Sequence, residues 1–176
     1  MEQTHEETAA ATSHVPTTDE LGNQVIRRNV YWSMGLGLIP IPLLDIVAVT
    51  GIQIKMLSEL AKLYNVPFSE HRAKSLISAI IGGVGAQQVA WRVMGSFLKT
   101  IPVVGTITTF TAMPIFGGAS TYAVGKVFIQ HFASGGTFLS FDPAAVREYY
   151  REMYEEGKKV AESIQDESAE EQPQAS

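Results

Sequence analysis

The side chains that most often do chemistry in enzymes are few and scattered in this sequence. Its four histidines, His5, His14, His71 and His131, do not have the spacing of metal ligands. The chain has no cysteine, which excludes thiolate catalysis, disulfides and Cys-ligated zinc. No serine stands in the glycine-flanked turn of a nucleophile elbow. We therefore expect no catalytic residue and no metal site.

Two glycine-rich stretches resemble nucleotide-binding loops only in part. Residues 83–88 lack the third glycine of a dinucleotide loop, and no strand pattern precedes them. Residues 118–126 have six residues between the glycines instead of four, and Lys126 is not followed by Ser or Thr. The basic residues form no dense patch of the kind that binds nucleic acid. We expect a protein that is not an enzyme, with no cofactor and no nucleic-acid partner.

Charge is distributed unevenly along the 176 residues. Residues 30–132 carry seven basic and three acidic side chains, a net charge of +4, whereas residues 1–29 and 133–176 carry −3 and −6. Charged residues make up 18% of the chain, below the roughly 25% of ordinary soluble domains. A basic, apolar middle between acidic ends argues against a disordered chain or a coiled coil.

Prolines divide this middle into helical segments, because each removes a backbone donor and disfavours helix in the residue before it. The pattern predicts helices over residues 19–39, 43–64, 70–99 and 101–131. We expect an all-α fold of two Pro-tipped helical hairpins, about four long helices, plus a C-terminal amphipathic helix. The hairpin tips would be Ile39, Pro40, Ile41, Pro42, Ile101 and Pro102.

The expected organisation begins with a disordered acidic tail over residues 1–18, followed by the apolar hairpin domain over residues 19–133. A linker over 134–141 leads to the amphipathic helix over 142–165, which Asp142 and Pro143 would open as N-cap and first residue. Residues 166–176 would form a second disordered acidic tail. The amphipathic helix would pack on the domain or dock a partner.

The longest uncharged stretch runs for 25 residues from Ile101 to Gly125, which indicates a candidate transmembrane segment. It contains Pro114 and Gly117-Gly118, so the alternatives are a kinked membrane helix and a buried soluble hairpin that breaks there. If both hairpins begin and end on one side of a membrane, the bases lie on the cytoplasmic side, near anionic lipid heads. These bases are Arg27, Arg28, Lys55, Lys62, Arg72, Lys74 and Lys126.

Two features predict how the hairpins associate. Asp45 and Lys99 lie near the two tips, and we expect them to pair, because a charge at membrane depth is costly alone. The alternative is that each is exposed to solvent in a soluble bundle. Small residues recur every four positions on one face of the third helix and would let another helix approach closely. They are Ser78, Gly82, Ala86 and Ala90.

The stretch from Trp32 to Asp45, WSMGLGLIPIPLLD, resembles the DUF697 family, and so do Gln53–Leu57, Leu60, Tyr64 and Val66–Phe68. The resemblance covers about residues 25–133. It implies a bacterial, membrane-associated protein of undefined biochemical function. Some members carry a GTPase domain on the same chain. This sequence has no P-loop, so it resembles a stand-alone form, for which a GTPase would act in trans.

The leading hypothesis is a non-catalytic, membrane-associated helical protein that serves as a scaffold, a membrane-remodelling protein or a regulatory partner. It would lie at the bacterial inner membrane with cytoplasmic tails, in contact with lipid and with a partner protein or further copies of itself. One alternative is a soluble, cytoplasmic helical bundle that self-assembles or binds a partner through its Gly-rich faces. Another is a small oligomeric channel or transporter module lined by the Thr-rich residues 106–111.

Overall fold

The computed structural model describes residues 15–36, 44–83 and 105–170. They form the helices α1 (Thr18–Leu36), α2 (Leu44–Leu63), α4 (Gly105–Ala133) and α5 (Arg147–Glu170), and residues 70–83 are also helical. No strand occurs in these ranges, and the all-α prediction is confirmed. The expected hairpin tips at 39–42 and 101–102 lie outside the described residues.

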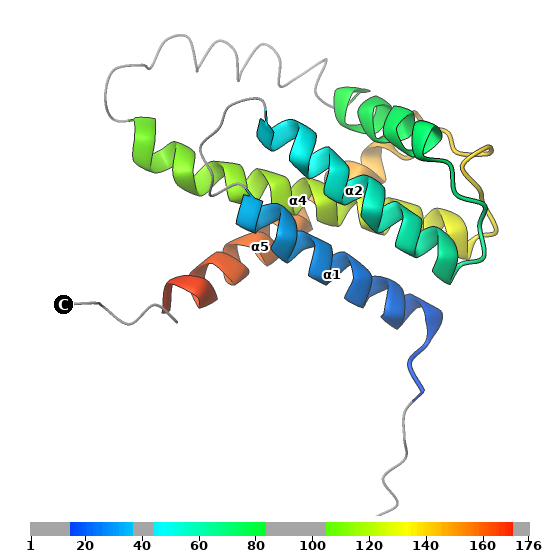
Figure 1. Cartoon of the computed structure of the whole chain (residues 1–176), viewed down its shortest axis with the longest axis horizontal. Helices are drawn as coiled ribbons and strands as arrows, with labels where there is room; N and C mark the ends of the chain where they lie inside the picture. Colours follow the sequence, from blue (N-terminus) through cyan, green and yellow to red (C-terminus); the bar gives the residue numbers. More distant parts are fainter. Residues whose placement is uncertain (1–14, 37–43, 84–104, 171–176) are drawn as a thin grey trace, which may run out of the picture.

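Three long helices form the body of the molecule (Figure 1). Helix α1 lies beside α2 and α4 and runs in the opposite direction to both. Helix α5 packs mainly on α4 and crosses it at an angle. The C-terminal end of α1 and the N-terminal ends of α2 and α4 therefore lie toward the same end of the bundle, on the left of Figure 1.

Local signals fix the start of α1 and the end of α2. The backbone NH of Thr17 donates to Glu20 Oε2 (2.7 Å) while the NH of Glu20 donates to Thr17 Oγ1 (3.2 Å), a reciprocal capping box. After α2, Asn65 takes the left-handed conformation (φ 56°), and the NH of Val66 donates to the carbonyl of Ala61 (2.7 Å). This Schellman turn satisfies a carbonyl that the helix end would leave free.

Helix α4 continues through Pro114 and the two glycines that follow it. The expected alternative of a hairpin broken at 114–118 is therefore wrong. The glycines are needed for packing, because a Cβ on Gly117 would lie 3.2 Å from the carbonyl oxygen of Ser33, and one on Gly125 would lie 2.5 Å from Ile26 Cγ1. Small residues here let α1 lie close against α4.

Helix α5 begins at Arg147, five residues after the expected N-cap Asp142. The Asp142 carboxylate instead accepts the NH of Ala144 (2.8 Å) in a local turn, and residues 143–146 form turns before the helix. The helix continues to Glu170, beyond residue 165, where we expected it to end. Its apolar face packs on α4, with Tyr150 and Ala161 buried.

One aromatic cluster explains the shape of the connection between α4 and α5. Phe141 stacks on Phe128 with ring centroids 4.5 Å apart, and Phe138 lies edge-on to Phe132 at 5.2 Å. All four rings are buried. Their burial holds the segment after α4 against the end of the bundle opposite to the one where α4 begins.

Candidate functional site

A layer of polar side chains crosses the centre of the bundle. Ser33 on α1 and Thr121 on α4 share a hydrogen bond between their hydroxyl oxygens (2.7 Å). Gln53 on α2 donates from Nε2 to Ser120 Oγ (3.1 Å), which also lies within hydrogen-bond distance of the Tyr150 hydroxyl on α5 (3.3 Å). These five side chains are buried, so the layer joins four helices at one level.

Large apolar side chains are exposed next to this layer on α1, and beyond it on α2 and α4 toward the end where these two helices start. Trp32 on α1 has 62% of its surface accessible, and Val47 on α2 has 69%. We call this set of side chains the apolar end. It consists of Tyr31, Trp32, Val47, Met113 and Phe116. The fold thus gathers on one end of the molecule exposed side chains that normally avoid water.

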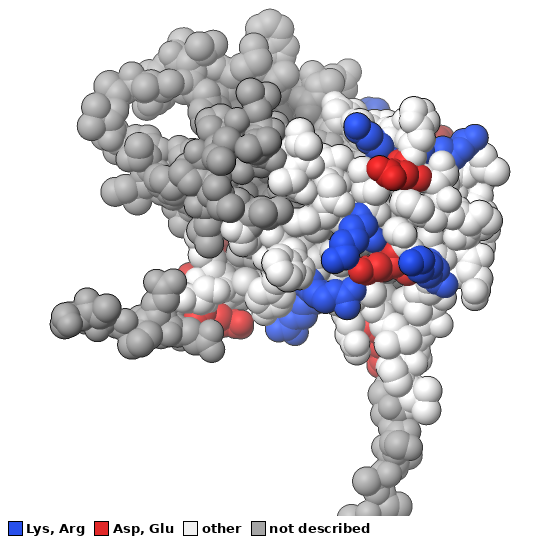
Figure 2. Space-filling view, in the orientation of Figure 1, with Lys and Arg blue, Asp and Glu red and all other residues white. Residues whose placement is uncertain are grey.

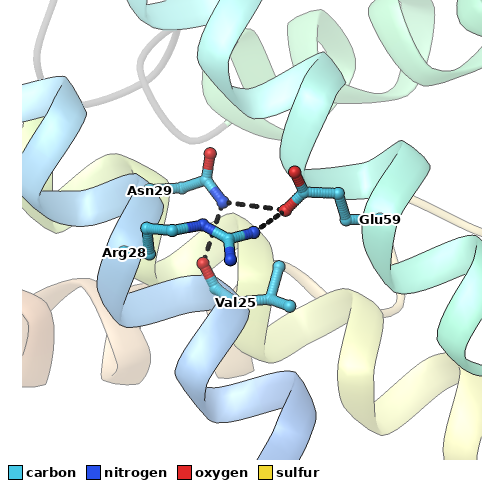
Figure 3. A network of polar contacts seen from close by, with 4 residues as sticks. All are labelled: Val25, Arg28, Asn29 and Glu59. Carbon is cyan, nitrogen blue, oxygen red and sulfur yellow. Dashed lines mark hydrogen bonds and ion pairs between the residues drawn. The ribbon is translucent and has the colours of Figure 1, made fainter.

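On the other side of the layer the surface is charged. Arg28 on α1 pairs with Glu59 on α2 (2.5 Å), and Asn29 donates both to Glu59 and to the carbonyl of Val25 (Figure 3). Lys126 on α4 donates to Asn23 Oδ1 on α1 (2.9 Å). These contacts join α1 to α2 and to α4 through polar groups, as expected of a surface that faces water.

Figure 2 shows the charged surface on one face of the molecule. Lysine and arginine, with a few acids between them, gather over the half that lies on the right of the view. Lys55 and Lys62 of α2 are exposed, and no ion pair involves them within the described part of the chain. Since Arg28 offsets Glu59, the α1–α2 surface retains a positive charge from Arg27, Lys55 and Lys62.

The structure places the seven predicted bases outside the apolar end. Arg72 and Lys74 are exposed in the helical residues 70–83, which follow the end of α2. Arg27 lies near Tyr31, with the guanidinium carbon 6.0 Å from the ring centroid. The hydrogen bond with the Tyr31 phenol raises the pKa of Arg27 further above its usual value, so this residue stays charged.

The other predicted site residues are placed only in part. Lys99 and the side chain of Asp45 lie outside what the structure describes, and their pairing stays a prediction. Ser78 and Gly82 are both exposed, and no atom of the residues that the structure describes lies within 4 Å of a Cβ built on Gly82. Ala86 and Ala90 fall outside the described residues.

Two features were missed by the sequence reasoning. The polar layer was not recognised, because Ser33, Gln53 and Thr121 stand alone in apolar segments and meet only across helices. The aromatic pair Tyr31–Trp32 was treated as part of an ordinary helix. Trp32 lies four residues after Arg28, the last charged residue before an uncharged stretch. Aromatic residues in such a position are typical of the aromatic belt at a membrane surface.

In the part of the chain that the structure describes, no helix has both the length and the hydropathy needed to cross a bilayer. The transmembrane helix expected from residues 101–125 is thus not supported by α4. Among the same residues, no group of histidines and carboxylates is arranged to hold a metal ion.

These observations define the class of all-α helical bundles with exposed apolar side chains at one end. Comparison with known proteins then identifies the family: residues 2–159 match the model described as "Domain of unknown function (DUF697)", and the chain belongs to this family. It is similar to magnetosome membrane protein 22 of Magnetospirillum gryphiswaldense, with 35% identity over 154 residues that cover 85% of this chain and 79% of the relative. No solved structure matches the chain.

Proposed function

We propose that this chain is a non-catalytic, membrane-associated helical protein that contacts lipid through its apolar end. The observation that carries the proposal is the gathering of Tyr31, Trp32, Val47, Met113 and Phe116 on one end of a bundle whose other half is charged. Trp and Tyr at such a boundary are characteristic of membrane interfaces, since their rings are apolar at one side and polar at the other.

The relative supports the same proposal. Magnetosome membrane protein 22 is named as a membrane protein and shares the family over most of both chains. This similarity supports a membrane location, and we propose that the membrane is a bacterial inner membrane, with the charged half of the bundle on the cytoplasmic side. In that position the charged half is available to a partner protein, for which the chain serves as a scaffold, a remodelling factor or a regulator. A GTPase acting in trans is the partner that the family resemblance favours.

The experiment is flotation of the purified full chain with vesicles of phosphatidylcholine and phosphatidylglycerol. The wild-type chain is expected to float with the vesicles, whereas the variant Trp32→Ala/Phe116→Ala stays at the bottom of the gradient. The matched control is Leu139→Ala, which removes a side chain that is 73% exposed in the connection after α4, at the opposite end. Circular dichroism confirms that the three chains are equally helical.

Failure of the wild-type chain to float with any vesicle contradicts the proposal. Sedimentation of the same sample then tests the alternative of a soluble bundle that self-assembles. That alternative draws support from Gly82, where no atom of the described residues lies within 4 Å of an added Cβ, so that a second helix could approach.

A further inference from the structure

We infer that the surface next to the apolar end binds the headgroups of anionic lipids, and that Arg27, Arg28 and Lys55 do so while Trp32 enters the leaflet below them. We call these three residues the basic collar. The inference rests on the proposed membrane association and adds the lipid class, the side chains that recognise it and the orientation of the bundle.

The spacing along α1 fits the thickness of a lipid headgroup layer. Arg28 and Arg27 precede Trp32 by four and five residues, which corresponds to about 6 and 8 Å along the helix axis. The headgroup region on each side of a bilayer is roughly 5–8 Å thick. If the Trp32 ring lies at the edge of the hydrocarbon, both arginines lie at the depth of the phosphates.

Helix α2 also has a base behind its exposed apolar side chain, but here the apolar residue comes first in the chain. Val47 is exposed at the apolar end, and the next charged residue after it is Lys55, about 12 Å further along the axis. A lysine stem extends several ångströms toward an interface, so the Lys55 ammonium reaches the same layer. On α4, too, the first charge after Met113 and Phe116 is a base, Lys126. In each of these three helices, therefore, a base is the first charge met behind the exposed apolar side chains.

The nearby acids leave the collar net positive. Glu59 is held by Arg28 and by Asn29 (Figure 3), so its charge is offset within the protein. Glu167 of α5 faces Arg27 across a shallow groove, whose lining also includes Asn23 and Tyr122. The Glu167 charge lessens the attraction between Arg27 and an anionic headgroup but leaves the attraction of Lys55 in place. Arg27 and Lys55 are both exposed and are the two collar bases most available to a headgroup.

The sequence next to this end favours lipid over an acidic protein as the occupant. Residues 37–43, which connect α1 to α2, carry no charge. Residues 84–104, which precede α4, carry Arg92 and Lys99 and no acid. Asp45, in the first turn of α2, adds one acid to Glu59 and Glu167, and the helix N-terminus favours it there. Apolar side chains bordered by bases, with few acids, complement a leaflet of anionic lipid.

The test compares vesicles of pure phosphatidylcholine with vesicles that contain phosphatidylglycerol, using the full chain and two variants of equal net charge. Arg27→Gln/Lys55→Gln removes two collar bases. The control Lys62→Gln/Arg72→Gln removes two exposed bases at a distance from the apolar end. We expect the collar variant to lose roughly five-fold in partition coefficient for each base on anionic vesicles, and the control far less.

Salt provides a second measurement on the same samples. Raising the ionic strength reduces binding of the wild-type chain to anionic vesicles and narrows its difference from the collar variant, since screening weakens the attraction. Equal losses in the collar and control variants overturn the inference, because net charge alone would then explain binding. Equal binding of the wild-type chain to both vesicle types also overturns it, while membrane association itself stands. Binding to neither type contradicts the proposed function instead.

Discussion

The hydroxyl oxygens of Ser33 and Thr121 lie 2.7 Å apart in the centre of the bundle, although 88 positions separate the two residues in the chain. Both residues are fully buried, with 0% of their surface exposed. The Ser33 hydroxyl therefore depends on Thr121 to replace the water that it gives up on folding, whereas Thr121 also accepts from the Gln53 amide. The bond favours this position of α1 along α4, because a shift by one turn would take the Ser33 hydroxyl away from Thr121.

A double-mutant cycle tests this dependence. Thr121→Val leaves the Ser33 hydroxyl without its partner, and we expect it to lower the free energy of unfolding by about 1–3 kcal/mol. Ser33→Ala/Thr121→Val removes both hydroxyls and is expected to cost less than the sum of the two single changes. The measurement is urea unfolding followed by circular dichroism. Additive losses contradict a direct interaction between the two side chains.

For Gln53 we predict a much smaller effect on stability. Its Nε2 donates to Ser120 and Thr121, but Oε1 is a buried side-chain oxygen with no hydrogen-bond partner in the part of the chain that the structure describes. Gln53→Leu removes that unpaired oxygen and keeps a similar volume, whereas Ser120 and Thr121 retain Tyr150 and Ser33 as partners. We expect the free energy of unfolding to change by less than about 1 kcal/mol. A loss comparable to that of Thr121→Val would show that the amide is essential to the layer.

The extents of α1 and α2 were predictable because the signals that set them are local. The expected start of the first helix at 19 and end of the second at 64 each differ by one residue from the observed Thr18 and Leu63. Thr17 and Glu20 cap the first, and Asn65 ends the second through its own backbone conformation. The start of α5 was misplaced because Asp142-Pro143 also suits a turn, and the stacking of Phe141 on Phe128 involves residues 13 positions apart.

The candidate site was less accessible to sequence reasoning. The apolar end contains side chains from three helices, and only the packing of α1 against α2 and α4 brings Trp32 and Val47 to one surface. Gly117 and Gly118 favoured the incorrect alternative of a helix break, because glycine weakens an isolated helix. In the bundle, glycines of α4 allow α1 to approach closely. This stabilising contact depends on the partner helix, so it cannot be predicted from the neighbouring sequence.

Gly157 makes the same kind of contact and gives a sharp test of packing. A Cβ at this position of α5 would lie 2.9 Å from the carbonyl oxygen of Ala119, a backbone atom that cannot rotate away. We expect Gly157→Ala to lower the free energy of unfolding by about 1–3 kcal/mol. The matched control is Gly51→Ala on α2, where the added Cβ has no atom within 4 Å among the described parts of the chain. It should raise stability by up to about 1 kcal/mol, because alanine favours helix.

Thermal unfolding of the two alanine variants separates packing from helix propensity. Opposite shifts in Tm relative to the wild-type chain are the expected outcome. If both variants are stabilised, α5 is not held against α4 as closely as the Gly157 contact requires.

Alkaline pH should loosen the attachment of α5, since tyrosines at its interface ionise less readily in the folded chain. Burial, with a smaller contribution from the nearby Tyr150 and Glu155, raises the pKa of Tyr154 to about 12. Burial and a hydrogen bond to Glu156 raise the pKa of Tyr122 as well. In the unfolded chain a tyrosine titrates near pH 10. Between these values the folded state binds more protons, so its stability falls as the pH rises.

We therefore expect the free energy of unfolding to be insensitive to these phenols below about pH 10 and to decline from there toward about pH 12. Tyr154→Phe removes one ionisable phenol and should make the decline less steep. The measurement is urea unfolding at several pH values, with tyrosinate absorbance at 295 nm recorded in parallel on the folded and the urea-unfolded chain. A folded chain whose tyrosines titrate together with those of the unfolded chain contradicts the prediction. The expected loss of stability at alkaline pH makes alkaline extraction a poor test of membrane insertion for this chain, because such a pH weakens the fold itself. Flotation at neutral pH is therefore the sharper experiment.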